Sequence, residues 1–431
     1  MTRPLFFFSA GEPSGDIHAA QLILELRRRF PRAEFTGYGG PEMEKAGCRV
    51  LVLMTELAVM WLGRVLWHLP TFLRHIRRAG AFFREHRPDA VILVDYPGFN
   101  WQIAKQAKKA GIPVYYYMPP QIWGWAQHRV KKMKRLTDHV LCCFPFEQKW
   151  LAEHGCHAYL TGHPFFEEVR KRTLDDSFMT DFRRNIQQDN KLLLLLPGSR
   201  NQEVAMNTRD MLHAAGRVVA QTPTVLPVIA AFKESHAERV RQEMRRQGLD
   251  FPVFVGRTPE LMAMASAALA VSGSVSVELL ARTCPTVIYY RVGKFPLLLS
   301  RFFRCVKYIT LTNLLAVDRV QGESLFFKRG LIAPAQLTDR ERSLTLFPEY
   351  LTAVDASLPV ANTLVIWLTD ETASAACRCA LRDLLQSADA QGDPVVNTAD
   401  YIMRTLEESP REQWRTQSET GTHCASTTDS P

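Results

Sequence analysis

Residues 5–16, which read LFFFSAGEPSGD, place a short apolar run directly before a loop that contains two glycines. The run from Leu5 to Ser9 is typical of a buried strand, and the apolar periodicity that continues to about Arg29 predicts a helix. We expect Ser14 to be the N-cap of this helix, with Asp16 in its first turn. A strand, a loop and a helix in this order predict a βα unit of a parallel sheet.

The same alternation of short apolar runs and helical patterns continues along the chain. It implies repeated βαβ units and parallel sheets. A polar, irregular stretch at 171–190 interrupts the rhythm, and we place the main domain boundary within it. The expected strands are 90–94, 113–117, 140–144 and 158–160 before this stretch, and 192–196, 225–231, 253–255, 268–271 and 286–290 after it.

The length and composition favour two domains. The chain has 431 residues, of which 46% are hydrophobic, enough for two sizeable cores. We expect one Rossmann-like domain at 1–185 and a second at 186–410, whose last helices could pack back on the first. The final stretch, 411–431, is rich in Ser, Thr, Gln and charge, and its composition predicts a disordered tail.

Charge and residue usage narrow the function classes. The formal net charge of +9 favours acidic partners such as nucleic acid, an anionic membrane or phosphorylated substrates. The basic residues are spread over both halves without a stacking motif, which argues against nucleic acid. No run reaches the roughly 18 apolar residues that span a bilayer, and the start is unlike a signal peptide, so we expect a cytoplasmic protein. The nine cysteines and twelve histidines show neither CxxC nor HExxH spacing, so we expect no metal and no cofactor.

Polar residues follow the expected strands, where ligands bind in open parallel sheets. In the first domain, Glu12, Ser14 and Asp16 lie in a glycine-containing loop that leads into a helix N-terminus, where anions are favoured. A tight turn explains the same glycines equally well. Asp95 comes directly after the strand 90–94, where desolvation would raise its pKa toward that of a general base. Its alternative role is the N-cap of the next helix.

The second domain offers a matching pair of loops. Arg200 follows the strand 192–196 and carries a charge suited to phosphate, although a surface arginine after a turn would look the same. Ser272, Gly273 and Ser274 precede an expected helix, and Glu278 follows about one turn later. Small residues and backbone N–H groups at a helix start favour a diphosphate, and Glu278 could accept hydrogen bonds from ribose hydroxyls. A capped helix with an acidic first turn is the alternative interpretation.

These loops, with further motifs in the same order, resemble the lipid-A-disaccharide synthase family from about residue 5 to residue 290, with matches beyond. Each motif alone is weak, and their number and order are specific. The matching stretches are 9–16 (SAGEPSGD), 39–41 (GGP), 56–60 (ELAVM), 95–100 (DYPGFN), 123–125 (WGW), 144–147 (FPFE), 162–164 (GHP), 196–200 (LPGSR), 272–278 (SGSVSVE), 290–291 (YR), 307–308 (KY) and 313–316 (NLLA).

The resemblance implies a GT-B fold, in which two Rossmann-like domains with parallel sheets face a central cleft. The N-terminal domain would bind the acceptor and the C-terminal domain the UDP-sugar. The implied reaction is an inverting transfer from UDP-2,3-diacylglucosamine to 2,3-diacylglucosamine 1-phosphate (lipid X), which yields lipid A disaccharide 1-phosphate and UDP. It needs no metal and no cofactor.

The resemblance also implies roles for individual residues. Asp95 becomes the general base for the acceptor's 6-hydroxyl, and Asn313 falls on a position important for activity. Arg200 and the 272–278 segment are assigned to UDP. Ser14, Asp16 and Asp89 also fall on family positions that are important for activity, although Asp89 precedes its strand and could be structural.

Acylated substrates imply a membrane partner, because each buried methylene contributes about 0.8 kcal/mol toward retention in the bilayer. We therefore expect peripheral association with the anionic inner-membrane surface. Two stretches that mix apolar and basic residues, 61–87 and 294–307, could mediate it, or could pack as amphipathic helices on the sheets. A homodimer is possible.

Departures from the family pattern leave alternatives open. The usual Ser-Pro-Ser is Pro119-Pro120-Gln121 here, Ala126 replaces a frequent arginine, and Thr312 replaces a frequent proline. The segment 317–346 is unusually long. These changes affect the acceptor and the acyl chains more than the reaction. Another UDP-sugar GT-B enzyme, either a different glycolipid transferase or a UDP-sugar 2-epimerase, is the alternative function.

Overall fold

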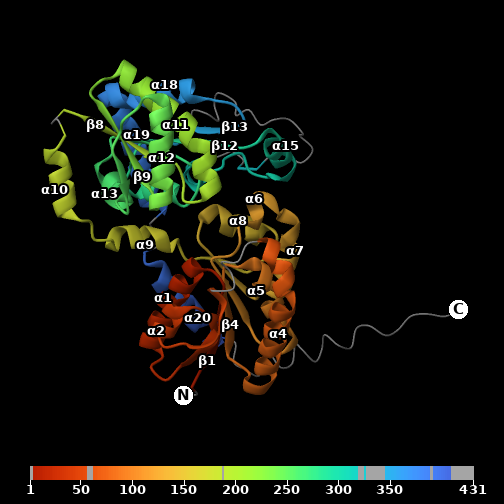
Figure 1. The fold of residues 1–431 in the computed structure, drawn as a ribbon. Helices are drawn as coiled ribbons and strands as arrows, with labels where there is room; N and C mark the ends of the chain where they lie inside the picture. The colour runs from red at the N-terminus through yellow and green to blue at the C-terminus, as the bar shows by residue number, and fades with distance from the viewer. Residues whose placement is uncertain are drawn as a thin grey trace. The chain divides into compact units, whose positions relative to one another are not determined.

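The computed structural model describes residues 3–55, 62–186, 189–318, 325–326, 345–388 and 392–408, with side chains omitted at 62–69 and 299–303. The chain divides into two compact units (Figure 1). Unit 1 comprises Met1–Pro164 and Gln391–Pro431, and unit 2 comprises Phe165–Ala390. The expected matches at 56–60, most of 317–346 and the tail 411–431 lie outside the described residues.

Unit 1 contains a seven-stranded sheet in the order β3-β2-β1-β4-β5-β6-β7, in which all neighbouring strands are parallel. Because β1 lies between β2 and β4, the loops after β1 and β4 leave the same edge of the sheet side by side. The strands are β1 (Leu5–Ala10), β2 (Glu34–Gly39), β3 (Arg49–Leu53), β4 (Ala90–Val94), β5 (Val114–Tyr117), β6 (His139–Cys142) and β7 (Ala158–Leu160).

Helices cover both faces of this sheet because alternate strand residues point to opposite sides. Phe6 and Phe8 of β1 pack with α1 and α20, whereas the ring of Phe7 meets Phe82 and Phe83 of α4. The helices of unit 1 are α1 (Pro13–Arg29), α2 (Pro41–Lys45), α4 (Leu62–His86), α5 (Pro97–Lys109), α6 (Ile122–Trp125), the 3₁₀ turn η1 (Gln127–Arg129), α7 (Val130–Leu136), α8 (Pro145–Glu153) and α20 (Pro394–Glu408), and α9 (Pro164–Lys171) follows at the junction.

Unit 2 contains a six-stranded parallel sheet in the order β10-β9-β8-β11-β12-β13. Its strands are β8 (Lys191–Leu196), β9 (Val225–Ala231), β10 (Val253–Val255), β11 (Ala267–Ala270), β12 (Thr286–Arg291) and β13 (Glu349–Thr352). Its helices are α10 (Asp176–Arg184), α11 (Asn201–Gln221), α12 (Glu234–Gln247), α13 (Thr258–Met264), α14 (Val275–Ala281), α15 (Lys294–Phe303), α16 (Leu311–Asp318), α18 (Ser357–Thr369) and α19 (Glu371–Ala388).

All strands expected from the sequence are present, with ends that differ by at most two residues. The sequence analysis missed β2, β3 and β13. These strands carry weak apolar signals: β2 contains two glycines, and no residue of β3 or β13 is fully buried. Their pairing with β1, β2 and β12 stabilises them, which is a contribution from tertiary structure.

The expected domain boundary at 185 is wrong, because the units divide after Pro164. The stretch 171–190 is not irregular, since it contains α10, whose N-cap Asp175 accepts a hydrogen bond from the Phe178 amide. The rings of Phe178 and Phe182 lie 5.5 and 5.6 Å from Phe254 of β10, which places this helix in unit 2.

The expected end of the C-terminal domain at 410 is also wrong, because unit 2 ends at Ala390. The expectation that the last helices pack back on the first domain is confirmed for α20, which belongs to unit 1. Ala399 and Ile402 are fully buried in the core beneath α1. Thr405 lies within hydrogen-bonding distance of the Tyr115 hydroxyl, at 2.8 Å. The chain therefore returns to its first unit to complete the core.

Candidate functional site

Asp95 and Tyr96, which follow β4, both have left-handed backbone conformations, with φ of 45° and 48°. Two consecutive non-glycine residues in this region are costly and need support from their surroundings. Asp95 is half-buried. Burial, followed by the negative charge of Glu12, raises the pKa of the Asp95 carboxyl to about 6. A carboxylate with this pKa suits a general base near neutral pH.

The support comes from Asn100 in the first turns of α5. Its amide nitrogen donates to the carbonyls of Ser9, Val94 and Asp95, at 3.1, 3.2 and 2.7 Å. Its carbonyl oxygen accepts from the Ser9 hydroxyl at 2.6 Å. The Tyr116 hydroxyl donates to the same Asp95 carbonyl at 2.9 Å. One fully buried side chain thus joins the carboxyl ends of β1 and β4.

Gly11 leaves the space that this turn needs. A Cβ atom at Gly11 would lie 2.1 Å from Cδ1 of Tyr96, so any larger residue would displace the tyrosine ring. The loop after β1 and the turn after β4 are therefore interlocked. This packing brings Glu12 close enough to Asp95 for its charge to act on the Asp95 carboxyl.

The other residues expected in the first loop have different positions. Helix α1 begins at Pro13 with Glu12 as its N-cap, so the prediction that Ser14 is the N-cap is wrong; proline is favoured at the first helical position. Ser14 is exposed in the first turn. Asp16 is buried, and its carboxylate accepts from the amides of Gly40, Glu42 and Met43. Asp16 therefore caps α2, which accounts for it without a substrate.

Asp95 is not the helix N-cap that the alternative interpretation requires, because Tyr96 occupies that position for α5. Asp89 has a structural contact, since its carboxylate accepts from the Leu5 amide at 2.8 Å. This bond ties the start of β1 to the residue before β4, at the sheet edge opposite Asp95. Of the two acids, only Asp95 lies at the edge where ligands bind.

Glu147 is another buried carboxylate with a raised pKa, and the sequence analysis gave it no role of its own. Its two oxygens accept from the Trp123 indole and the Cys143 amide, each at 3.0 Å. Burial raises its pKa to about 7. Because only 2% of Glu147 is exposed, it fixes α6 against α8 and is not positioned to take a proton from a substrate. The sequence feature that could have indicated Glu147 is its place in the 144–147 motif, which resembles the family as the 123–125 motif does.

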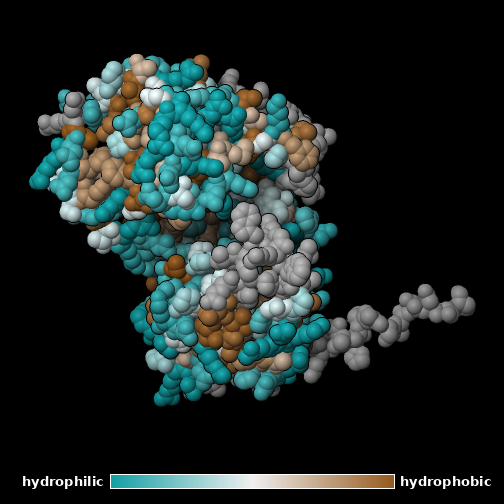
Figure 2. All heavy atoms as spheres, in the orientation of Figure 1, coloured by the Kyte–Doolittle hydropathy of each residue, from teal (hydrophilic) through white to brown (hydrophobic). Residues whose placement is uncertain are grey.

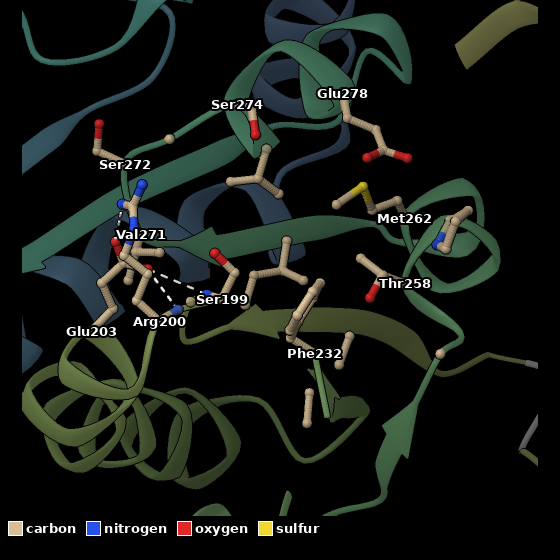
Figure 3. A pocket seen from close by; sticks show the side chains of 18 of the residues that line it. Ser199, Arg200, Glu203, Phe232, Thr258, Met262, Val271, Ser272, Ser274 and Glu278 are labelled. Carbon is tan, nitrogen blue, oxygen red and sulfur yellow. Dashed lines mark hydrogen bonds and ion pairs between the residues drawn. The ribbon is translucent and has the colours of Figure 1, made fainter. Parts of the chain in front are cut away.

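Unit 2 contains a cavity of about 560 Å³ at the carboxyl ends of β8, β9 and β11. Figure 3 shows Arg200 and Ser272 at one end, Thr258 and Met262 at the other, and the Phe232 ring between them. The cavity is lined by Phe165, Arg172, Leu196, Gly198, Ser199, Arg200, Glu203, Ala230, Ala231, Phe232, Gly256, Thr258, Pro259, Met262, Val271, Ser272, Gly273, Ser274, Val275 and Glu278. Figure 3 also shows the Glu278 carboxylate near Met262, so polar groups lie toward both ends of the cavity.

Glu203 on α11 holds the turn that presents Arg200. One of its oxygens accepts from the amides of Ser199 and Arg200, both at 3.2 Å, and the other pairs with the Arg200 guanidinium at 2.8 Å. Gly198 has a φ of 121°, and a Cβ there would lie 2.7 Å from Cβ of Glu203. The Arg200 side chain is 82% exposed and so remains accessible to an anion.

Ser272, Gly273 and Ser274 form a turn at the edge of the cavity, immediately before α14. The Ser272 hydroxyl donates to the Ile309 carbonyl at 2.9 Å, which orients its oxygen. Ser274 is the N-cap of α14 but makes no side-chain cap bond. Glu278 lines the same cavity, and its Oε1 lies 2.6 Å from Nη1 of Arg172. The structure thus brings Arg200, the serine turn and Glu278 to one cavity.

Asn313 does not line this cavity but lies fully buried behind it. Its amide nitrogen donates to the Phe347 carbonyl and to Glu349, and its oxygen accepts from the amides of Leu346 and Phe347. Glu349 also accepts from the amide of Ile309, the residue that holds Ser272. The geometry makes Asn313 a positioning residue for the serine turn instead of a group that contacts substrate.

One group of side chains in the described part of the chain could approach a cation. Ligand atoms of Asp210, His213 and Asp355 all lie within 4.8 Å of one another. The Asp210 carboxylate, however, is already paired with the Arg291 guanidinium at 2.6 Å and accepts from the Tyr289 hydroxyl. A guanidinium at this distance opposes cation binding.

Two parallel α/β units, each with polar side chains beyond the carboxyl ends of its strands, define a GT-B protein, the class that includes many nucleotide-sugar enzymes. Solved structures with this fold include a UDP-GlcNAc 2-epimerase from Neisseria meningitidis bound to UDP-GlcNAc, with a TM-score of 0.56, 12% identity, and coverage of 95% of this chain and 100% of that one. The calicheamicin glycosyltransferase CalG4 has a TM-score of 0.56, 14% identity and the same coverage. At these identities the similarity concerns the fold.

Sequence similarity identifies the family. The family model described as lipid-A-disaccharide synthetase matches residues 6–336. The lipid-A-disaccharide synthase of Myxococcus xanthus is 34% identical over 339 residues, 79% of this chain and 87% of the relative. That of Nitrosococcus oceani is 34% identical over 353 residues, 80% and 90% of the two chains. The chain belongs to the lipid-A-disaccharide synthase family and is a glycosyltransferase of lipid A biosynthesis.

The Asn100 network predicts a combined loss of stability and activity in Asn100→Ala. The substitution removes the Asn100 donor from the carbonyls of Ser9, Val94 and Asp95, of which the Asp95 carbonyl keeps the Tyr116 hydroxyl, and we expect the free energy of unfolding to fall by about 1–3 kcal/mol. Because the Asp95 turn loses its support, glycosyl transfer should fall further than stability alone explains. Urea unfolding followed by tryptophan fluorescence, with a transfer assay at low temperature, measures both. Asn362→Ala, at an exposed position of α18, is the matched control, and equal behaviour of the two variants would contradict the prediction.

Proposed function

We propose that the chain transfers the sugar of UDP-2,3-diacylglucosamine to the 6-hydroxyl of 2,3-diacylglucosamine 1-phosphate (lipid X), forming lipid A disaccharide 1-phosphate and UDP. The name of the family, lipid-A-disaccharide synthase, supports a disaccharide as the product. The observation that carries the proposal is Asp95, a half-buried carboxylate at the ligand edge of the sheet whose pKa is raised to about 6. Such a group is ionised at neutral pH and still basic enough to accept a proton in the transition state.

The proposed step is a single displacement with inversion. Asp95 takes the proton of the acceptor's 6-hydroxyl while that oxygen forms a bond to the anomeric carbon of the donor. The bond from this carbon to the diphosphate oxygen breaks, and UDP leaves with the electron pair. General-base catalysis contributes about 10²–10⁴-fold, so positioning and stabilisation of the departing diphosphate must supply the remainder.

In this proposal, the cavity of unit 2 binds the UDP part of the donor. The end with Arg200 and the serine turn suits the diphosphate, because guanidinium groups and backbone turns bind phosphate well. The ring of Phe232 is 67% exposed within the cavity and offers a face for a nucleobase. Glu278 would accept hydrogen bonds from the ribose hydroxyls.

Acylated substrates also require access to a membrane. No helix among the described residues is long and apolar enough to cross one. Helix α15 exposes Phe295 and Leu298, and α4 exposes Leu73 among several arginines. Figure 2 shows hydrophobic residues on the surface over α15. We propose that these helices contact the anionic inner-membrane surface peripherally, because apolar and basic side chains together bind such surfaces.

The proposed reaction can be tested directly. In detergent micelles containing EDTA, purified protein given both substrates should form disaccharide 1-phosphate and UDP, followed by mass spectrometry. Asp95→Asn should lower kcat by about 10²–10⁴-fold while UDP binding is retained, because only the base is lost. Asp181→Asn, in an exposed ion pair with Arg184, is the control. A folded protein that binds UDP but forms no disaccharide with any acyl length would refute the assignment.

The pH dependence gives a further prediction. Asp95 is active when ionised, so kcat/KM should rise with pH through about 6 and then level off. Because the charge of Glu12 raises the pKa of Asp95, Glu12→Gln should move this acidic limb to lower pH. The variant should therefore keep a larger fraction of its plateau rate at about pH 5.5. A limb that stays in place, or moves to higher pH, would show that Glu12 does not act on the base.

Membrane contact predicts a separable defect. Phe295→Asp with Leu298→Asp should weaken sedimentation with vesicles of mixed anionic lipid, because two apolar side chains are replaced by charges of the wrong sign. UDP binding should be unchanged. Leu358→Asp, at a similarly exposed position of α18, is the control. Equal sedimentation of the α15 variant and wild type would exclude α15 as a contact.

A further inference from the structure

Arg172 is a cavity residue to which the sequence analysis gave no role. It lies in the connection between α9 and α10, and its guanidinium Nη1 is 2.6 Å from Oε1 of Glu278. The Arg172 side chain is 34% exposed and that of Glu278 is 10% exposed. Both residues line the unit 2 cavity. The pair is therefore part of the wall that a ligand would meet.

The Glu278 carboxylate depends on this partner because it is buried. Burial raises the pKa of Glu278, and Arg172 is the group that opposes this most strongly. Arg282, further along α14, also favours the ionised form, whereas Glu168 on α9 disfavours it. The other cavity residues from α13 and β9, such as Thr258, Met262 and Phe232, carry no charge. Without Arg172, Glu278 would remain shielded from water but would lose its main stabilising charge. Its ionised form would then be less favoured.

The geometry leaves one carboxylate oxygen for a ligand. Arg172 occupies Oε1 of Glu278, and within the described part of the chain Oε2 receives no hydrogen bond. An ionised carboxylate has several acceptor positions, so the remaining ones can serve a neighbouring pair of hydroxyl groups. Because an arginine held at one oxygen restricts rotation of the group, the other oxygen keeps a defined direction.

We propose that Arg172 is a positioning residue that holds Glu278 as an ionised, oriented acceptor for the ribose hydroxyls of the UDP-sugar. The inference rests on the proposed function, since it requires that the cavity bind UDP. In this inference, Arg172 acts on the nucleoside part of UDP, through Glu278, and does not contact the diphosphate. An arginine in such a cavity would ordinarily be expected to bind phosphate.

Two ligands separate these roles. We would titrate wild type, Arg172→Gln, Arg172→Lys, Glu278→Gln and the Arg172→Gln/Glu278→Gln double variant with UDP by calorimetry, and with uridine by ligand-observed NMR. Arg172→Gln should weaken the binding of UDP and of uridine by the same factor, about ten-fold, because both ligands carry the ribose hydroxyls that Glu278 accepts from. The double variant should bind no more weakly than Glu278→Gln alone. Arg172→Lys should recover most of the affinity because it restores the charge. Arg184→Gln, in an exposed ion pair of α10, is the control.

The pH dependence excludes a merely structural effect. Raising the pH favours the ionised form of Glu278 even without its partner, so the deficit of Arg172→Gln relative to wild type should narrow as the pH is raised. Comparison with wild type at each pH removes the titration of UDP itself. A deficit that is constant with pH would overturn the inference, as would an unchanged affinity.

A different pattern would also overturn it while leaving the proposed function intact. Arg172→Gln could weaken the binding of UDP but not that of uridine, and do so equally in the Glu278→Gln background. This result would mean that Arg172 contacts the diphosphate directly. Failure of wild type to bind UDP would instead contradict the proposed function, and the inference with it.

Discussion

The Asn100 side chain makes the contacts on which the arrangement of unit 1 around Asp95 depends. In a parallel sheet the loops after β1 and β4 leave the same edge, but nothing in the ladder holds those loops together. Asn100 does so with hydrogen bonds to both strands. Asn100 also donates to the Asp95 carbonyl and so stabilises the left-handed backbone of Asp95. The same side chain therefore connects the two strands and orients the proposed base.

In unit 2, carboxylate side chains hold the loops that follow the strands. Glu203 holds the turn that presents Arg200, and Glu349 with Asn313 supports the segment behind Ser272. In each case a buried acceptor binds backbone amides that a loop would otherwise leave unpaired. The turns that carry Arg200 and Ser272 are therefore each held by hydrogen bonds within unit 2.

Asp95 and Glu147 of unit 1 both have a raised pKa, but burial affects the two acids differently because their partners differ. Asp95 is half-buried near another acid, so its raised pKa is compatible with proton transfer. Glu147 is more deeply buried and accepts from an indole and an amide, so its raised pKa accompanies a structural role. A perturbed pKa identifies a functional residue only together with access to a ligand.

The sequence by itself determined the fold class, the strongly apolar strands, the turns that carry Asp95 and Arg200, and the helix start that carries Glu278, because buried parallel strands and the polar residues after them are local patterns. Weak strands such as β13 could not be recognised, since their stability comes from a neighbouring strand. Only the tertiary structure assigned Asp16 to α2, Asn313 to the support of the serine turn and Arg172 to Glu278, and only it showed which of the last helices returns to unit 1. Each of these contacts joins residues far apart in the chain, so no local pattern in the sequence indicates which partner a polar side chain will meet.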